Sequence, residues 1–198
     1  MAVFPETITL IGVNHKTASL ELRERLACAG GYDGPLAALA KVETVKEYYL
    51  LSTCNRVEIL FVCHQGVKPQ KEILSALFSP AVSADELLPH LYQYEQQEAV
   101  AHLFQVAASL DSMVVGEAQI LGQMKDAYRY AAERGSTGLI LNRLLHKSFS
   151  VAKRVRTETR IGASAVSISY AAVELGRKIF GDLNGKQVLL IGAGEMAE

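Results

Sequence analysis

The sequence has few cysteines and no hydrophobic run long enough to span a membrane. Its three cysteines, Cys28, Cys54 and Cys63, show no C-x-x-C spacing, which argues against a disulfide framework and against a zinc site. Free thiols are typical of a reducing compartment, so we expect a cytoplasmic protein. No stretch approaches the roughly 20 apolar residues of a membrane span. The first residues also lack the basic region and cleavage site of a secretory signal.

An excess of charge of one sign is also missing. The net charge of −1 gives no global sign of a nucleic-acid-binding protein. Between positions 139 and 160, however, a single acid, Glu158, stands among six basic residues. These are Arg143, Lys147, Lys153, Arg154, Arg156 and Arg160. Such a segment is either a solvated helix face or a surface that faces phosphates, and its charge alone does not decide between the two.

Apolar residues are plentiful, at 49% of the sequence, and their pattern divides the chain. Up to about residue 95, strands alternate with helices. The predicted strands are 7–13, 45–53, 57–63 and 92–95, and the predicted helices are 20–29, 35–43, 68–78 and 84–91. This mixture predicts an α/β (α+β) sandwich with a small, at least partly antiparallel sheet.

After residue 96 the pattern is helical, and it ends in a glycine-rich turn. Helices are predicted at 96–110, 117–134, 138–159 and 167–180, with glycines between them. An apolar run at 188–191 then precedes Gly192-x-Gly194-x-x-Ala197, which is the order of strand and turn that opens a dinucleotide-binding unit. We interpret it as the first strand and turn of a nucleotide-binding domain. It should bind no dinucleotide alone, because the pyrophosphate needs the N-terminus of a following helix.

Cys54 is the candidate nucleophile, because it lies in a predicted turn between two strands. Asn55 favours a turn, and Arg56 can lie on the same side as the thiol, where its positive charge favours the nucleophilic thiolate. Thr53 and Asn55 offer hydrogen bonds to a substrate. A free cysteine is otherwise most often a small buried hydrophobe, which is the alternative for Cys54 and our interpretation of Cys28 and Cys63.

Two helices add polar candidates. In the helix 96–110 the predicted apolar stripe is Val100, Leu103, Phe104, Ala107 and Leu110. His102 falls on the opposite side, so it should be either solvated or turned toward a polar cleft as an acid or base. In the next helix Gln119 and Gln123 share a face at i,i+4 spacing. They could hold a polar ligand, although paired glutamines are also common on helix surfaces.

Four stretches of the sequence resemble the glutamyl-tRNA reductase family. They are GVNHKTA at 12–18, STCNRVE at 52–58, HLFQVAASLDSMVVGEAQILGQMKDAY at 102–128 and LLIGAGEMAE at 189–198. They run in the family's order, although Ser19 and Ala118 replace prolines that are usual there. The resemblance implies a ferredoxin-like catalytic domain at 1–160, a connector (spinal) helix at 161–184, and the truncated start of an NADPH-binding Rossmann domain at 185–198.

The resemblance also implies a reaction and a set of site residues. The reaction is NADPH-dependent reduction of glutamyl-tRNA to glutamate-1-semialdehyde through a thioester on Cys54, the first step of five-carbon tetrapyrrole biosynthesis. His102 is implied in activity, and Arg56 would bind the substrate's side-chain carboxylate. The implied substrate pocket is Thr53, Asn55, Arg56, Ser112, Glu117, Ala118, Gln119 and Gln123. The implied cofactor residues are Gly192, Ala193, Gly194, Glu195, Met196 and Ala197.

The partners implied are glutamyl-tRNA, with the basic segment 139–160 in contact with it, a second copy of the full-length protein in a homodimer, and the downstream semialdehyde aminomutase. No membrane partner is implied. Two other classes also fit the residues. A non-catalytic tRNA-binding or regulatory module would tolerate loss of Cys54, whereas a thiol-dependent glutamyl-tRNA esterase would pass the thioester to water. Release of glutamate from charged tRNA, with and without Cys54, separates these classes.

Overall fold

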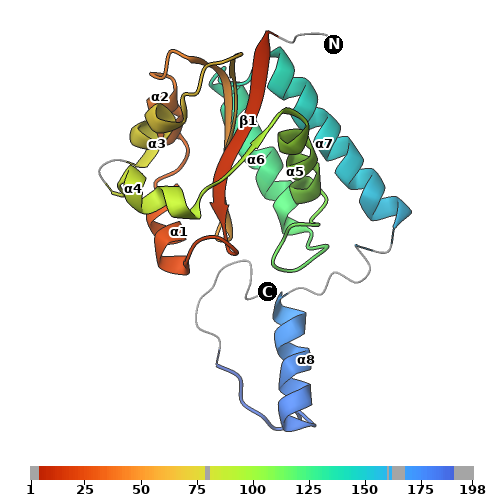
Figure 1. Cartoon of the computed structure of the whole chain (residues 1–198). Coiled ribbons are helices and arrows are strands. Elements are labelled where there is room, and N and C mark those ends of the chain that lie inside the picture. Colours follow the sequence, from red (N-terminus) through yellow and green to blue (C-terminus); the bar gives the residue numbers. More distant parts are fainter. Residues whose placement is uncertain (1–4, 79–80, 160, 162–167, 190–198) are drawn as a thin grey trace.

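The computed structural model describes residues 5–78, 81–159, 161 and 168–189, and an antiparallel sheet lies at its centre (Figure 1). The strand order is β2-β3-β1-β4. The strands are β1 (Glu6–Asn14), β2 (Val45–Ser52), β3 (Arg56–His64) and β4 (Tyr92–Glu95). All three neighbouring pairs are antiparallel, including the hairpin of β2 and β3. The hairpin turn holds the residues on which the site is built.

One face of the sheet is covered by the helices that connect its strands. These are α1 (Leu20–Leu26), α2 (Asp33–Leu39), α3 (Gln70–Phe78), α4 (Ala84–Leu87) and the short 3-10 helix η1 (Leu88–His90). The resulting β-α-β-β-α-β order, with this arrangement of strands, is that of the ferredoxin-like motif. The predicted α/β (α+β) class is therefore confirmed, and the sheet is antiparallel throughout the described residues.

The other face is covered by α5 (Gln96–Ala107), α6 (Gln119–Glu133) and α7 (Leu139–Glu158), which Figure 1 shows on the opposite side of the sheet from α1–α4. Because helices cover both faces, β3 is buried from Arg56 to Cys63. Successive side chains of a strand point to opposite faces. Ile59 packs in the core beneath α1–α4, whereas Leu60 packs in the core beneath α5–α7. Arg56 therefore shares the face of Leu60 and points toward α5.

The buried face of α5 differs from the predicted stripe. Its buried residues are Ala99, His102, Leu103, Val106 and Ala107. Val100 and Phe104 are only half-buried, and Leu110 lies beyond the end of the helix and is exposed. The prediction followed the large apolar side chains. Leu103 and Ala107 of the predicted stripe are buried, but Ala99 and Val106 join them in place of Val100 and Phe104, and His102 meets a buried carboxylate on the sheet.

The start of α7 is held by a carboxylate that is distant in sequence. Glu47 on β2 accepts hydrogen bonds from the backbone N–H groups of Gly138 (2.9 Å), Ile140 (3.1 Å) and Leu141 (2.7 Å). These groups have no partner within the helix, and a negative charge at a helix N-terminus is stabilising. A side chain at position 138 would collide with this carboxylate, since a Cβ there would lie 2.6 Å from Oε1 of Glu47. The contact fixes α7 against the sheet.

Helix α8 (Ile168–Phe180) carries an exposed apolar surface, and no strand follows it within the described residues. Val188 and Leu189 are each 83% exposed and lie in no strand, so the described part of 188–191 is not the buried strand of a complete nucleotide-binding domain. A strand requires a neighbouring strand, and the described residues offer none here. The predicted cofactor residues 192–197 lie outside the described residues. No described helix has the length and apolar character needed to cross a membrane.

Candidate active site

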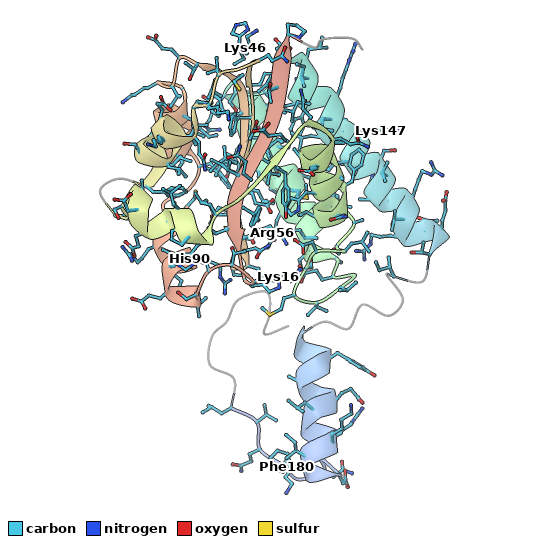
Figure 2. All side chains as sticks on the ribbon, in the orientation of Figure 1. Lys16, Lys46, Arg56, His90, Lys147 and Phe180 are labelled. Carbon is cyan, nitrogen blue, oxygen red and sulfur yellow. The ribbon has the colours of Figure 1, made fainter. Side chains whose placement is uncertain are left out.

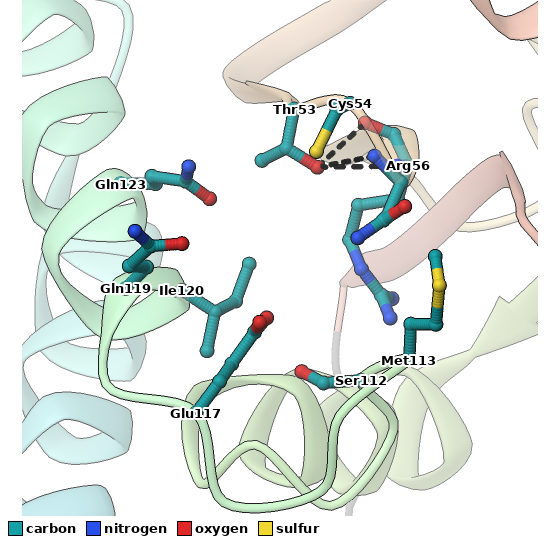
Figure 3. Close-up of a pocket in the computed structure, with 10 residues that line it drawn as sticks. Thr53, Cys54, Arg56, Ser112, Met113, Glu117, Gln119, Ile120 and Gln123 are labelled. Carbon is teal, nitrogen blue, oxygen red and sulfur yellow. Dashed lines mark hydrogen bonds between the residues drawn. The ribbon is translucent and has the colours of Figure 1, made fainter. Parts of the chain in front are cut away.

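The turn between β2 and β3 places Cys54 at the surface. The hydroxyl oxygen of Thr53 accepts hydrogen bonds from the backbone N–H groups of Asn55 (3.2 Å) and Arg56 (3.1 Å), which are drawn in Figure 3. The N–H of Thr53 donates to the carbonyl of Arg56 at 2.8 Å. A local side-chain bond of this kind stabilises a turn. Thr53 therefore shapes the turn, which leaves the Cys54 side chain exposed.

A small pocket opens beside Cys54, and it gathers most of the predicted site residues (Figure 3). It is lined by Thr53, Cys54, Asn55, Arg56, Ser112, Met113, Glu117, Gln119, Ile120 and Gln123. Gln119 and Gln123, on the first turns of α6, lie across the pocket from Cys54. Two predicted residues do not line it. Ala118 is the N-cap of α6, and His102 lies deeper in the fold.

The pocket contains hydrogen-bonding capacity that the described residues leave unused. The hydroxyl oxygen of Ser112 is buried and has no hydrogen-bond partner among them. A buried hydroxyl without a partner is unfavourable, so such groups are normally satisfied by a ligand or by water. This unmet hydroxyl, beside an exposed thiol, is the feature expected of a pocket for a polar ligand.

Arg56 borders the pocket, but its charge is already balanced by two acids. Its guanidinium Nη1 lies 2.6 Å from Oε1 of Glu58. Its Nη2 lies 3.3 Å from Oδ2 of Asp111 and also donates to the backbone carbonyl of Asp111. Burial lowers the pKa of Arg56, but the neighbouring charge of Glu58 outweighs this and raises it, so the guanidinium stays protonated. Arg56 thus enters the pocket as part of an ion cluster, held in one orientation.

Glu58 is the centre of that cluster. Its Oε1 oxygen accepts hydrogen bonds from Arg56, from the hydroxyl of Tyr92 at 2.6 Å and from Nε2 of His102 at 2.8 Å. Burial raises the pKa of Glu58, but the hydrogen bond from His102 and the charge of Arg56 outweigh it and hold that pKa below its ordinary value. The sequence analysis did not single out Glu58. An acid between Val57 and Ile59, inside an apolar strand, was the available signal, because a buried charge has to be paired.

His102 is buried, contrary to the prediction that it is solvated or faces a cleft. It is 7% exposed, and its ring lies 5.4 Å from that of Tyr92 and 4.8 Å from that of Tyr94. The polar group that draws it inward is Glu58, on a strand 44 positions away in sequence. His102 contacts the ion cluster rather than the pocket, so any influence on Cys54 passes through Glu58 and Arg56.

The loop between α5 and α6 forms the pocket wall that carries Ser112 and Glu117. The predicted helix 96–110 ends at Ala107, and Ser109 adopts a φ of 59°, which is unusual for a residue other than glycine. Its hydroxyl donates to the carbonyl of Glu117 at 2.5 Å, which closes the loop. The unusual backbone conformation of Ser109 and this hydrogen bond together set the course of the loop that forms the pocket wall.

Two cations anchor this loop from outside. The ammonium of Lys16 lies 2.5 Å from Oδ1 of Asp111. Nη1 of Arg156, near the end of α7, donates to the carbonyls of Gly116 (3.2 Å) and Glu117 (2.9 Å). Burial raises the pKa of Asp111, but the hydrogen bond from Lys16 and the charge of Arg56 lower it overall, so Asp111 is a carboxylate. The pocket wall is thus fixed to the turn after β1, to β3 and to α7.

The other two cysteines lack the setting of Cys54. Burial raises the pKa of the Cys28 thiol and that of the Cys63 thiol, which makes both poorer nucleophiles. Cys54 alone among the three is exposed. The described residues contain no group of three or more histidines, cysteines and acids that could hold a metal ion.

The domain is ferredoxin-like, and an accessible thiol lies at the mouth of a polar pocket. These features are typical of domains that bind a polar ligand beside a nucleophilic cysteine. Residues 11–159 match the family model described as "Glutamyl-tRNAGlu reductase, N-terminal domain". The chain belongs to this family.

Similar proteins support this assignment. Proteins named glutamyl-tRNA reductase from Desulfotalea psychrophila and Syntrophobacter fumaroxidans are each 58% identical to the chain, over 99% and 96% of it. The solved structure of glutamyl-tRNA reductase from Methanopyrus kandleri matches 96% of the chain with a TM-score of 0.65 and 35% identity. The chain spans 46% and 42% of the two sequence relatives and 44% of the solved structure.

Proposed function

We propose that this chain is the glutamyl-tRNA-binding and acyl-transfer part of an NADPH-dependent glutamyl-tRNA reductase. The observation that carries the proposal is the exposed Cys54 thiol at a pocket lined by Ser112, Gln119 and Gln123, three residues that the family resemblance implied. Membership of the family and the names of the relatives support glutamyl-tRNA as the substrate.

Acyl transfer starts with the Cys54 thiolate. The sulfur attacks the ester carbonyl that joins glutamate to the terminal ribose of the tRNA. A carbon–sulfur bond forms, the carbon–oxygen ester bond breaks, and the ribose oxygen leaves as an alkoxide that takes a proton from water. The product is a glutamyl thioester, so one difficult reduction is divided into two easier steps. NADPH, for which residues 192–197 are the predicted site, would supply the hydride that reduces the thioester to glutamate-1-semialdehyde.

The pocket then has to hold the substrate's side-chain carboxylate. Figure 3 shows the Arg56 guanidinium extending toward Ser112 at one side of the pocket. Glu58 and Asp111 already occupy part of the Arg56 guanidinium. Its remaining N–H groups bind the side-chain carboxylate of the substrate, together with the Ser112 hydroxyl. Glu58 fixes the guanidinium in place, and His102 fixes Glu58. We assign His102 this positioning role instead of direct proton transfer.

The exposed face of α7 is the proposed tRNA contact. Arg143, Lys147 and Arg154 are exposed and recur at spacings that place them on one side of the helix (Lys147 is labelled in Figure 2). Arg156 lies in the last turn of α7, on a different side of the helix from these three residues, and binds the loop of the pocket. From Arg143 to Arg154 the basic stripe extends over about 16 Å, at 1.5 Å per residue. Phosphates along an RNA strand fit such a stripe.

The family resemblance also supports a proposal on the cellular setting. We propose a cytoplasmic homodimer whose product is taken up by the semialdehyde aminomutase.

A thiol-dependent esterase is the second candidate, and the exposure of Cys54 favours it. Water can reach the sulfur of an exposed residue, so a thioester formed there without hydride would hydrolyse. The chain would then release free glutamate slowly over repeated cycles.

A tRNA-release assay tests the proposal. Labelled glutamyl-tRNA is mixed with the chain in excess, and deacylated tRNA is followed in a single turnover for wild type, Cys54→Ser and Cys28→Ser. We expect rapid release for wild type and Cys28→Ser and near-background release for Cys54→Ser. Tight tRNA binding without release by wild type would instead indicate a non-catalytic module. Continued release of glutamate under multiple-turnover conditions would identify the esterase.

A further inference from the structure

Arg23 contacts the Cys54 turn and does not line the pocket. It belongs to α1, which starts after Ser19, whose hydroxyl accepts the N–H of Leu22 at 3.3 Å. Its guanidinium Nη1 donates to the backbone carbonyl of Cys54 and lies 3.5 Å from the side-chain oxygen of Asn55. The side chain is only 9% exposed, and its Nε is buried without a hydrogen-bond partner among the described residues.

No acid within the described residues forms an ion pair with Arg23, which in this respect resembles Arg156 and differs from Arg56 and Lys16. Arg56 is paired with Glu58 and Asp111, and Lys16 is paired with Asp111. Placing a charge inside a protein without a counter-charge is costly. Such a group is therefore expected to have a function that compensates for the cost.

The remaining charged and titratable neighbours do not neutralise Arg23. His15 follows β1, and its backbone N–H donates to the carbonyl of Asn55 at 2.9 Å. Burial, together with the charges of Lys16 and Arg56, lowers the pKa of His15, so its imidazole is neutral at pH 7 and above. The carboxylate of Glu117 lies on the opposite wall of the pocket, which Figure 3 shows away from the turn.

We propose that Arg23 is a positioning residue of the thiol site. It fixes the main chain of Cys54 through the carbonyl, and its unpaired positive charge draws anionic reactants to the Cys54 sulfur. The inference rests on the proposed function for its biological meaning, since glutamyl-tRNA is anionic and its ester carbonyl gains negative charge during attack. The physical property itself belongs to the thiol and can be measured without tRNA.

The test compares two alkylating reagents of similar size. Iodoacetate carries a negative charge and iodoacetamide is neutral; in each case a sulfur–carbon bond forms and iodide leaves. The ratio of the two rate constants at Cys54 therefore reports the electrostatic potential at the sulfur. The measurement uses the whole chain in a Cys28→Ser background at pH 8 and low salt, with peptide mass spectrometry to confirm that Cys54 is the residue modified.

Three variants define the outcome. Arg23→Met removes the charge at similar length, Arg23→Lys keeps it, and Arg25→Met is the matched control on the same helix. Arg25 is exposed and paired with Glu86 at 2.5 Å, so its charge is already balanced. We expect the ratio of the iodoacetate to the iodoacetamide rate constant to fall about fivefold in Arg23→Met. This is the effect of removing one positive charge that lies several ångströms from the sulfur. It should stay within twofold of wild type in Arg23→Lys and Arg25→Met.

Melting curves confirm that each variant is folded at the assay temperature. If Arg23→Met is not, Arg23→Gln replaces it, since its amide can still donate to the Cys54 carbonyl. An unchanged ratio in the folded uncharged variant overturns the proposal, and so does an equal fall in Arg25→Met. A selective fall at Arg23 in a chain that does not release tRNA leaves this inference standing and rejects the proposed function.

Discussion

The Nη1 nitrogen of Arg56 lies 2.6 Å from the Oε1 oxygen of Glu58, and the two side chains are only 2% and 3% exposed. The pair sits on one strand, two residues apart, on the face that meets α5. The same oxygen of Glu58 also binds His102 and Tyr92. The orientation of the arginine beside Cys54 therefore depends on a carboxylate that lines no part of the pocket.

Removing the charge of Glu58 should destabilise the fold. Glu58→Gln leaves Arg56 buried with Asp111 as its remaining acid, and breaking a buried pair on one side costs about 3 kcal/mol. Urea unfolding followed by circular dichroism measures the change in the free energy of unfolding. Tyr92→Phe is the matched control: it removes one hydrogen bond to the same oxygen, keeps the charge of Glu58, and should cost about 1.5 kcal/mol. Equal effects of the two variants would contradict the assignment of Glu58 as the centre of the cluster.

The stabilisation by Glu58 should also depend on pH. Its pKa in the folded chain lies below the ordinary glutamate value of about 4.3, so the unfolded chain binds the proton more tightly. The contribution is therefore fully present above about pH 4.3 and is lost as the pH falls through the folded-state pKa. The stability gap between wild type and Glu58→Gln should be constant from pH 7 to 5 and should narrow below pH 4. A gap that stays constant down to pH 3 would exclude this linkage.

Arg56→Lys should strongly impair catalysis in the full-length reductase, although lysine keeps the positive charge. Lysine lacks the fork that binds Glu58, Asp111 and a substrate carboxylate at once. We expect kcat/KM to fall by well over tenfold. A tenfold fall corresponds to a loss of about 1.4 kcal/mol of transition-state stabilisation. Arg25→Lys, at an exposed ion pair, should leave kcat/KM within twofold of wild type. A decrease of less than threefold in Arg56→Lys would assign carboxylate recognition to another residue.

His102 should act through Glu58, and a double-mutant cycle can show it. If both belong to one network, the cost of His102→Gln in unfolding free energy should be smaller in the Glu58→Gln background than in wild type. The coupling should be about 2 kcal/mol, the scale of a hydrogen bond to a charged group. Additive effects would mean that the contact of His102 with Glu58 contributes little.

The cap of α7 gives a prediction on stability alone. Gly138→Ala should destabilise the chain by about 1 kcal/mol or more, because the new Cβ meets the Glu47 carboxylate and disturbs the helix N-terminus. Gly122→Ala is the matched control, since a Cβ at that exposed position within α6 meets no atom within 4 Å. Alanine should stabilise a helix there by about 0.5–1 kcal/mol. Thermal unfolding of the two variants should therefore shift in opposite directions.

The sequence predicted the strands and the thiol turn because both depend on local signals. The starts and ends of β1, β2 and β3 agree with the predicted ranges to within one residue, since apolar runs are bounded by turn residues such as Asn55. Gln119 and Gln123 fall on one face by helix geometry alone, and the structure brings that face to Cys54.

The contacts that the sequence could not predict are those between distant elements. The burial of His102 follows from Glu58, which is 44 positions away, and the Cys54 turn is held by Arg23, which is 31 positions away. Helical periodicity places His102 opposite the large apolar side chains of α5 and contains no information about the carboxylate on the sheet. Tertiary pairing decided which face of the helix is buried.

Cys54 is proposed to form a covalent bond to the glutamyl group, and intact-protein mass spectrometry tests this bond most directly. The chain is mixed with glutamyl-tRNA, quenched in acid to preserve a thioester, and analysed beside Cys54→Ala, Cys28→Ala and Cys63→Ala. We expect one glutamyl group per chain in wild type, Cys28→Ala and Cys63→Ala, located at Cys54 by peptide mapping, and none in Cys54→Ala. Full labelling of Cys54→Ala, or a glutamyl group located at another residue of wild type, would contradict the account.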